Sequence, residues 1–108
     1  MRLSNLNDIP FEPVSHNPEL KKQVLIKEGF SCIRHFSHIV FKPGDTAVEH
    51  THDQGYEVFY CIRGEILFMV GGKEVLLEGG SFLVVEPREP HSLRATTEAE
   101  MVYFFALL

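Results

Sequence analysis

From Phe30 to the end of the chain, short runs rich in Val, Ile, Leu, Phe and Tyr alternate with Gly- or Pro-containing turns. None of these runs repeats its apolar residues at the 3.6-residue spacing of an amphipathic helix. β-Branched and aromatic residues favour strands, and many short strands at close spacing are typical of a closed barrel or a sandwich. We therefore predict an all-β body with strands at residues 35–41, 47–52, 57–63, 65–70, 73–78, 81–85, 91–95 and 101–107.

The clearest turn in this body is Gly71-Gly72, which separates two apolar runs. A two-residue hairpin of type I′ or II′ requires positive φ angles, which glycine adopts without steric cost. We predict a tight β-hairpin at this point.

Residues 1–29 differ from the rest, because Pro10, Pro13 and Pro18 interrupt a polar segment that cannot run as one regular element. We therefore divide the chain into an N-terminal arm, residues 1–29, and a barrel, residues 30–108. The arm is expected to pack on the barrel or on a partner.

Two short elements are predicted inside the arm. Asn17 supplies an N-cap, Pro18 suits the first position of a helix, and Glu19 suits the positive end of its dipole. This pattern indicates one or two helical turns that end at Lys22. A short strand is expected at residues 24–26.

The chain has 108 residues, the length of one ordinary domain, and its formal net charge is −5. Its only basic cluster is the pair Lys21 and Lys22, so we expect neither nucleic acid nor an anionic membrane as a partner. No apolar stretch approaches the roughly 18 residues that span a bilayer, and the N-terminus lacks a secretory signal, so a cytoplasmic protein is expected. In that compartment Cys32 and Cys61 should remain thiols.

His50 and His52 form an H-x-H motif inside a predicted strand. Since strand side chains alternate between faces, both imidazoles should point the same way, about 7 Å apart. Glu57 follows a turn that contains Gly55 and can return a carboxylate to the same place. His91, far along the chain, would complete a set of four.

Three imidazoles and one carboxylate suit one divalent transition metal, with one or two positions left for water, substrate or dioxygen. Geometry and availability choose among such metals more than ligand type does. Fe, Mn, Zn, Ni, Co and Cu therefore all remain candidates.

At these residues the chain resembles the cupin superfamily. The first cupin motif is a Gly, five residues, His-x-His, three or four residues, a Glu, six residues and a Gly. Here it stands as Gly44, His50, His52, Glu57 and Gly64, with every gap allowed.

The second cupin motif is matched in part. Gly80 and His91 fall in register, but Glu86 replaces a Pro, Arg88 replaces a Gly and Ala95 replaces an Asn. The charged residues before His91 have two interpretations: a solvated turn, or a charged rim of the pocket.

The resemblance implies a double-stranded β-helix, the jelly-roll barrel of the cupins, in which His50, His52, Glu57 and His91 hold one metal. Family members use this site for dioxygenation, isomerisation, decarboxylation, epimerisation or ligand sensing. Once the four ligands are assigned, no obvious inward His or Lys remains as an acid or base. We therefore favour a dioxygenase-like small-molecule metalloenzyme, with a sugar or keto-acid isomerase and a non-catalytic ligand-binding or sensing module as alternatives.

Other pocket residues follow from strand alternation. If Glu57 faces inward, the inward residues after it on the same strand are Phe59, Cys61 and Arg63. His35 and His38 face opposite sides of another strand, so at most one can line the pocket, while His16 is expected in solvent. The candidates for the pocket lining are Phe59, Cys61, Arg63, His38 and Tyr103.

The outward residues of this strand, Val58, Tyr60 and Ile62, are also apolar. A strand that is hydrophobic on both faces must be covered on both. Because proteins of the family that this chain resembles are commonly dimers, this predicts a homodimer. Folding of the arm over its own barrel is the alternative.

Overall fold

Two β-sheets and one short 3₁₀ turn make up the computed structural model, which describes residues 1–108. The 3₁₀ turn is Leu6–Asp8, and no helical segment has the length and hydrophobicity needed to cross a bilayer. The strands are β1 (Phe11–Val14), β2 (Asn17–Ile26), β3 (Ile33–Phe41), β4 (Thr46–His50), β5 (Gly55–Arg63), β6 (Glu65–Val70), β7 (Lys73–Glu78), β8 (Phe82–Val85), β9 (His91–Ala95) and β10 (Ala99–Leu107).

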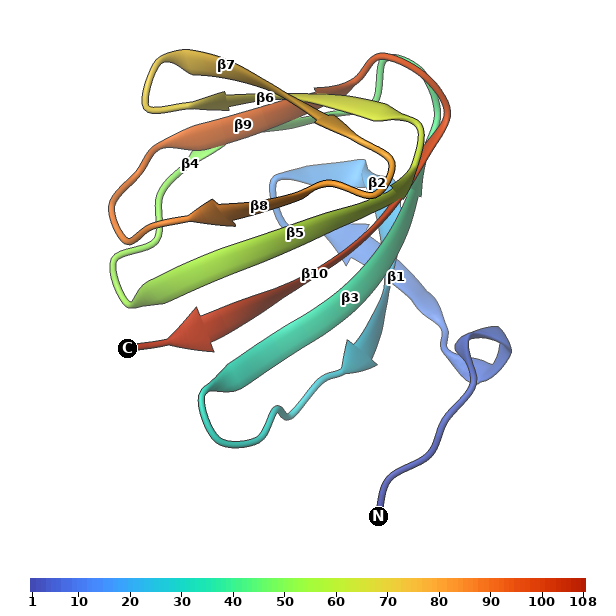
Figure 1. The fold of residues 1–108 in the computed structure, drawn as a ribbon. Helices are drawn as coiled ribbons and strands as arrows, with labels where there is room; N and C mark the ends of the chain where they lie inside the picture. The colour runs from blue at the N-terminus through green and yellow to red at the C-terminus, as the bar shows by residue number, and fades with distance from the viewer.

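The strands pair into a six-stranded sheet of order β1-β2-β3-β10-β5-β8 and a four-stranded sheet of order β4-β9-β6-β7. The two sheets face each other as the two layers of a jelly-roll barrel (Figure 1). This arrangement confirms the all-β prediction and its fold class. All eight strands expected in the body are present, with ends that differ by a few residues.

The predicted Gly71-Gly72 hairpin is also confirmed. Both glycines have positive φ, +56° and +80°, as a type I′ turn requires. The turn closes the β6–β7 ladder, in which Val70 pairs with Lys73.

The predicted helical turn from Asn17 to Lys22 is wrong, because these residues belong to the long strand β2. Pro18 lies at the start of β2, beside an irregularity in the β1–β2 ladder, where a missing N–H is tolerated. Antiparallel pairing of Asn17, Lys21 and Lys22 with β1 outweighs the local capping signal, and β3 pairs with the later residues of β2. The strand expected at residues 24–26 is the end of β2.

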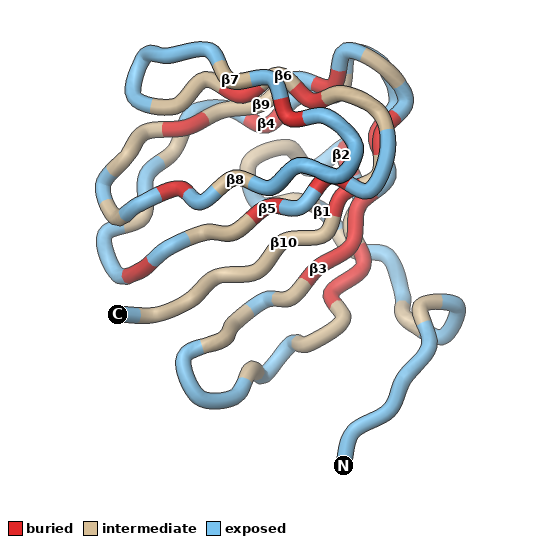
Figure 2. The backbone as a smooth tube through the Cα atoms, viewed as in Figure 1, coloured by how far each residue is buried: buried red, intermediate tan, exposed pale blue.

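Apolar side chains from both sheets form the core between the layers, among them Phe41, Ile66, Phe68 and Met101, each at most 1% exposed. The longest buried stretch is on β3, at residues 37–39 (Figure 2). Consecutive residues face opposite sides of a sheet, and both sides are covered here: one by the core, and the other by the N-terminal segment, which lies near the outer face of the six-stranded sheet. The buried Gln23, which pairs with His38, donates hydrogen bonds from Nε2 to the carbonyl oxygens of Leu6 and Ile9.

Candidate metal centre

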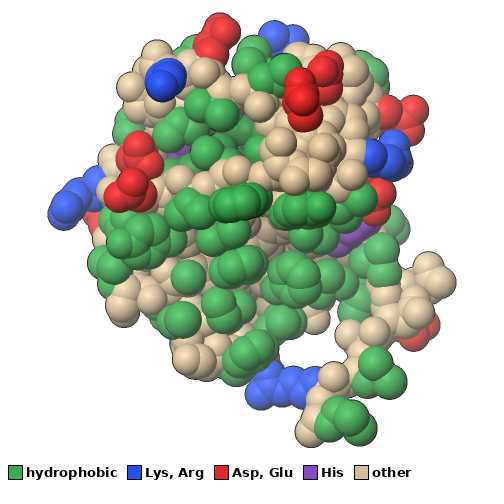
Figure 3. Space-filling model, in the orientation of Figure 1, with side chains coloured by type: hydrophobic (Ala, Val, Ile, Leu, Met, Phe, Trp, Pro, Cys, Tyr) green, Lys and Arg blue, Asp and Glu red, His purple; other side chains and the backbone are tan.

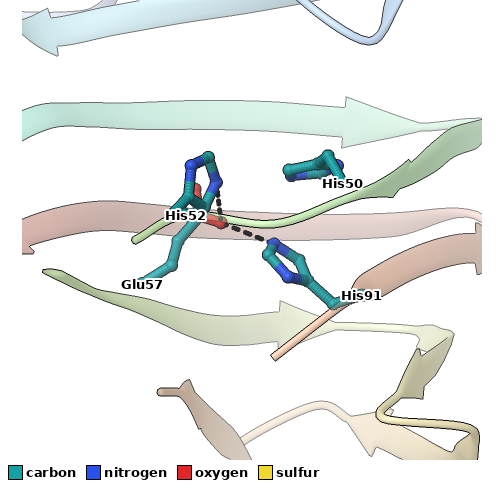
Figure 4. Close-up of side chains that lie close together, drawn as sticks. All are labelled: His50, His52, Glu57 and His91. Carbon is teal, nitrogen blue, oxygen red and sulfur yellow. Dashed lines mark hydrogen bonds and ion pairs between the residues drawn. The ribbon is translucent and has the colours of Figure 1, made fainter. Parts of the chain in front are cut away.

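Four side chains from three strands and one loop meet inside the barrel. His50 ends β4, His52 lies in the following loop, Glu57 is in β5 and His91 begins β9. One ligand atom from each lies within 4.8 Å of those of the others. In Figure 4, the rings of His52 and His91 both point toward the Glu57 carboxylate.

The two sheets bring these residues together by close approaches of the backbone. His50 and His91 are direct partners in the β4–β9 ladder. β5 begins at Gly55, where an added Cβ would lie 2.2 Å from the carbonyl oxygen of Ala106. Only glycine allows this contact between β5 and β10, which sets the position of Glu57 two residues later.

The loop before His91 departs from the cupin pattern and is held by backbone hydrogen bonds. Arg88 stands where the pattern has Gly, and it adopts a positive φ of +69°. Its N–H donates a 2.7 Å hydrogen bond to the carbonyl oxygen of His52, which ties this loop to the H-x-H segment. The Glu89 carboxylate accepts a hydrogen bond from the N–H of Glu86. The cavity beside the cluster is not lined by these loop residues, which favours a turn over a pocket rim.

Backbone carbonyls orient two of the imidazoles. Nδ1 of His50 lies 2.8 Å from the carbonyl oxygen of Val48, and Nδ1 of His91 lies 2.9 Å from that of Glu89. A carbonyl only accepts hydrogen bonds, so we assign the proton to Nδ1 in both rings. In the neutral form this leaves the Nε2 lone pair free for a metal, as in many metal-binding histidines.

His52 supplies the most specific sign that the cluster fits a cation. Its Nε2 is buried and has no hydrogen-bond partner, although it lies 3.3 Å from Oε1 of Glu57. A buried nitrogen without a partner costs free energy, and a coordinated ion would satisfy it. These four residues therefore fit a divalent transition metal in both donor type and placement.

The electrostatics of the site favour the metal-binding protonation states of Glu57 and His50. Burial of Glu57 acts to raise its pKa, but the close imidazoles of His52 and His91 outweigh this effect and lower the pKa to about 2. Burial lowers the pKa of His50, and the neighbouring histidines add to this effect. Near neutral pH, Glu57 is thus a carboxylate and His50 a neutral imidazole.

A cavity of about 400 Å³ opens beside the cluster. Aromatic rings form part of its wall: Phe59 stacks with Tyr103 at a centroid distance of 5.6 Å, and Phe105 meets His52 edge-on at 5.3 Å. Burial, reinforced by the Glu57 charge, raises the pKa of Tyr103 to about 12. Tyr103 therefore offers a protonated hydroxyl to whatever occupies the cavity.

Of the residues expected to line the pocket, Phe59 and Tyr103 do so, whereas Cys61, Arg63 and His38 lie outside the lining. Cys61 is a fully buried free thiol, and its Sγ donates to the carbonyl oxygen of Arg63. Burial raises the pKa of this thiol, so it is held in its protonated form.

Arg63 and His38 lie on the outer side of the six-stranded sheet, where both contact Glu100. Arg63 is Glu100's partner in the β5–β10 ladder, but Cys61 pairs with Met101, so one extra residue of β5 interrupts the alternation before Arg63. Oε1 of Glu100 lies 3.2 Å from Nε of Arg63, and Oε2 lies 2.6 Å from Nε2 of His38.

The cavity also contains residues that the sequence reasoning missed: His16, Lys22 and His35. The ring of His16, expected in solvent, stacks on His50 with a centroid distance of 3.9 Å and an interplanar angle of 14°. No local signal identified these residues, because they reach the cavity only through the β1–β2 turn, the pairing of β2 with β3 and a bulge in β3 at His35.

The fold and the cluster place the chain in one class of proteins: small jelly-roll barrels whose interior holds three histidines and one glutamate that fit a metal. The chain matches the cupin domain family over residues 37–107 and belongs to that family. This range contains all four residues of the cluster.

Two curated relatives resemble part of the chain. Quercetin 2,3-dioxygenase of Bacillus subtilis (strain 168) is 39% identical over 51 residues, 47% of this chain and 15% of that protein. An oxalate-binding protein of Thermotoga maritima is 25% identical over 75 residues, 69% of this chain and 62% of that protein. The matched segments thus span less than two thirds of either relative.

Among solved structures, a "predicted oxalate decarboxylase" from Thermotoga maritima superposes with a TM-score of 0.88. The match covers 99% of this chain and 100% of that chain at 23% sequence identity. At this level of identity the likeness shows a shared fold.

Proposed function

We propose that His50, His52, Glu57 and His91 bind one divalent transition metal and that the loaded site oxygenates a small organic molecule. The metal site is supported above all by the buried Nε2 of His52, which has no hydrogen-bond partner and lies among three other donor groups. The observation that favours an organic substrate is the cavity of about 400 Å³ beside them. That volume is within the range of small-molecule sites.

A metal in this site would act as a Lewis acid toward a substrate oxygen, and iron or manganese would also allow redox chemistry with dioxygen. The chain's own residues bind and orient the substrate. Phe59 and Phe105 offer apolar surface to a flat molecule and exclude water from one side of it. The Tyr103 hydroxyl, with its pKa raised to about 12, remains a hydrogen-bond donor and does not act as a base near neutral pH.

The relatives support this choice in different degrees. The segment shared with quercetin 2,3-dioxygenase is 39% identical, and that protein's name describes oxygenation of a flat aromatic molecule. The oxalate-binding protein is named for a small dianion. Both names are compatible with a metal-centred cavity that takes an oxygen-rich organic ligand.

The test begins with metal content. Protein purified without added metal, or titrated with Fe²⁺, Mn²⁺ and Zn²⁺, should hold about one equivalent of metal per chain. The variants His50→Ala and His91→Ala should each hold less than about 0.2 equivalents. His35→Asn removes an imidazole that is outside the cluster and should retain the metal, so it serves as the control.

Oxygen uptake then tests the reaction. The loaded protein is incubated with a flavonol, a catechol and a 1,3-diketone while dissolved oxygen and products are followed by electrode and mass spectrometry. We expect uptake with at least one class of substrate and none with His91→Ala. Full metal loading without oxygen uptake from any of the three classes would contradict the proposed oxygenation and leave the metal site standing.

An isomerase is the second candidate, and one specific observation favours it. The expectation that no inward His or Lys remains as an acid or base is wrong, because His16, Lys22 and His35 all line the cavity. An uncoordinated base beside a Lewis acid is the arrangement that proton transfer next to a carbonyl requires. Deuterium incorporation into keto acids or ketoses in D₂O without oxygen, lost in His16→Phe, would identify this activity.

The outer face of the six-stranded sheet is apolar and exposed between β3 and β8. Figure 3 shows hydrophobic side chains gathered on this face. Phe82 is 69% exposed, and Tyr60, Ile62 and Val84 are each 43% exposed. Contiguous apolar patches larger than a few hundred Å² are uncommon on monomers.

We propose that a second copy of the chain covers this face, as the sequence led us to expect. A standard interface needs about 800 Å² from each partner, which a face spanning four strands can supply. Arg63 and Glu100 place both signs of charge beside the patch, as a self-complementary surface requires.

A further inference from the structure

We propose that His16, Lys22 and His35 make the cavity selective for organic anions that carry an apolar body. This inference concerns the ligand of the same cavity and therefore rests on the proposed function. It assigns recognition to side chains that lie outside the four-residue cluster.

The three side chains share an origin in the first part of the chain. His16 lies in the β1–β2 turn, Lys22 in β2 and His35 near the start of β3. The cupin match begins only at residue 37. The matched barrel thus supplies the candidate metal ligands, and the segment before it supplies additional nitrogen donors to the same cavity.

Lys22 provides a positive charge without a partner in the protein. It lines the cavity and is partly buried, and its ammonium group makes no hydrogen bond or ion pair. Its neighbour across the hairpin, Glu12, instead pairs with Nζ of Lys27 at 3.0 Å. The adjacent Lys21 is exposed, and its Nζ donates to the carbonyl oxygen of Pro18.

The two imidazoles are held at the cavity by backbone features. The strand that follows the His16 turn is tied to β4 by a 2.7 Å hydrogen bond from Nδ2 of Asn17 to the carbonyl oxygen of Thr46. His35 is an exposed residue of the lining and has a φ of +56°, an uncommon conformation for a residue other than glycine, at the bulge opposite Phe104. Neither side chain forms a hydrogen bond within the protein, so both can bond a ligand.

The charge balance of the cavity decides the class of ligand. Glu57 is the one carboxylate in the lining, and Glu12, whose charge also acts on Tyr103, is paired with Lys27. A divalent metal and Lys22 would set three positive charges against this single negative charge. A neutral ligand would leave this excess uncompensated in a partly buried site, whereas a carboxylate or enolate would reduce it.

The size and walls of the cavity add the second requirement. About 400 Å³ is far more than a carboxylate group occupies, and apolar residues such as Phe59, Leu93 and Met101 line much of the remainder. The anionic head of the ligand would meet the metal and the nitrogen donors, and its apolar body would lie against these side chains.

The test uses two probes of nearly equal shape, 2-naphthoate and the neutral 2-naphthamide, titrated by calorimetry into the Zn²⁺-loaded protein. We expect wild type to bind naphthoate at least about tenfold more tightly than naphthamide. Lys22→Met should weaken naphthoate binding about tenfold and change naphthamide binding less than twofold. His16→Phe, which keeps a stacking ring, and His35→Asn should each weaken naphthoate binding by a smaller factor.

Lys21→Met is the matched control, because it removes the same charge one residue away on the outside of the strand. It should leave both affinities within about twofold of wild type. Equal loss of naphthoate binding in Lys21→Met and Lys22→Met, or no loss in Lys22→Met, would overturn the inference. So would a wild-type protein that does not bind naphthoate in preference to naphthamide.

Failure of the proposed function gives a different result. If the protein takes up no metal, the excess of positive charge that the metal would add is absent, but the ammonium group of Lys22 still has no partner. The same titrations on the metal-free protein should then show a smaller preference for naphthoate that is lost in Lys22→Met. If it takes up metal and shows no oxygen uptake, the selectivity for naphthoate is unaffected. Anion selectivity and oxygenation are thus measured separately.

Discussion

Nε2 of His91 lies 3.0 Å from Oε1 of Glu57, while Nδ1 of the same ring lies 2.9 Å from the carbonyl oxygen of Glu89. Both neighbours are acceptors, and a neutral imidazole has only one N–H to donate. Both acceptors are therefore satisfied in either of two ways. The ring can be protonated on both nitrogens, or Nδ1 can keep its proton while a cation is bound by Nε2 and the carboxylate. A proton and a metal compete for this position.

The first prediction is that metal binding displaces this proton. Burial acts to lower the pKa of His91, but its hydrogen bonds to Glu57 and Glu89 and their charges together raise it. Metal affinity should thus increase as pH rises through the raised pKa of His91. Calorimetric titration with Zn²⁺ in two buffers of different ionisation enthalpy should reveal proton release at pH 6 that declines by pH 8. Equal proton release at both values would contradict it.

The second prediction is that the metal stabilises a barrel that already folds without it. A ligand at 100 times its dissociation constant adds about 2.7 kcal/mol to the free energy of unfolding. EDTA should therefore lower the Tm of loaded wild type while its far-UV circular dichroism at 25 °C stays unchanged. His50→Ala should fold but show no response to EDTA. Unfolding of wild type by EDTA at room temperature would indicate a structural metal instead.

The third prediction concerns the Glu100 carboxylate, away from the candidate metal site. Its hydrogen bond with His38, assisted by Arg63, lowers its pKa against the opposing effect of burial. A depressed pKa in the folded state adds stability above the unfolded-state pKa, and that stability is lost as pH falls through the folded-state pKa. Glu100→Gln should therefore be less stable than wild type at pH 7, and the difference should shrink toward pH 3.

Thermal denaturation across this pH range measures the effect. Glu98→Gln, which neutralises an exposed carboxylate two residues away, is the control and should track wild type throughout. A constant difference between Glu100→Gln and wild type at every pH would indicate a packing effect in place of the ion pair.

The fourth prediction tests the homodimer. A charge placed on the exposed apolar face of the six-stranded sheet should be driven out of any interface there. Phe82→Glu and Tyr60→Glu are therefore expected to be monomers in light scattering coupled to gel filtration, where wild type is a dimer. Leu76→Glu, at a 46% exposed position on the other sheet, should remain dimeric. A monomeric wild type would exclude this assembly.

Much of the barrel could be predicted from the sequence because its signals are local. The Gly71-Gly72 turn needs only two adjacent residues with positive φ, and the body strands follow from β-branched and aromatic runs. The spacing of His50, His52 and Glu57 likewise places three candidate metal ligands on two consecutive strands and the loop that joins them. The predicted strand beyond His50 was too long, but His52 still reaches the cluster from the loop.

Predictions made from neighbouring residues alone were wrong where the pairing of strands decides the secondary structure or the direction of a side chain. Asn17, Pro18 and Glu19 resemble a helix start, yet Asn17 pairs with Val14 of β1 and the chain continues as a strand that pairs with β1 and then β3. Simple alternation placed Arg63 inside the barrel, but one extra residue in β5 turns it toward Glu100. A bulge depends on the partner strand and leaves no reliable mark in a single sequence.

The strands of the body, the tight hairpin and the four candidate metal ligands could be predicted from the sequence alone, because each depends on residues near one another or on a recognisable spacing. Only the tertiary structure brought His16, Lys22 and His35 to the cavity and sent His38 and Arg63 to the outer face. Those positions depend on which strands pair and where a bulge shifts the register, and one added residue moves a side chain to the opposite face of a sheet.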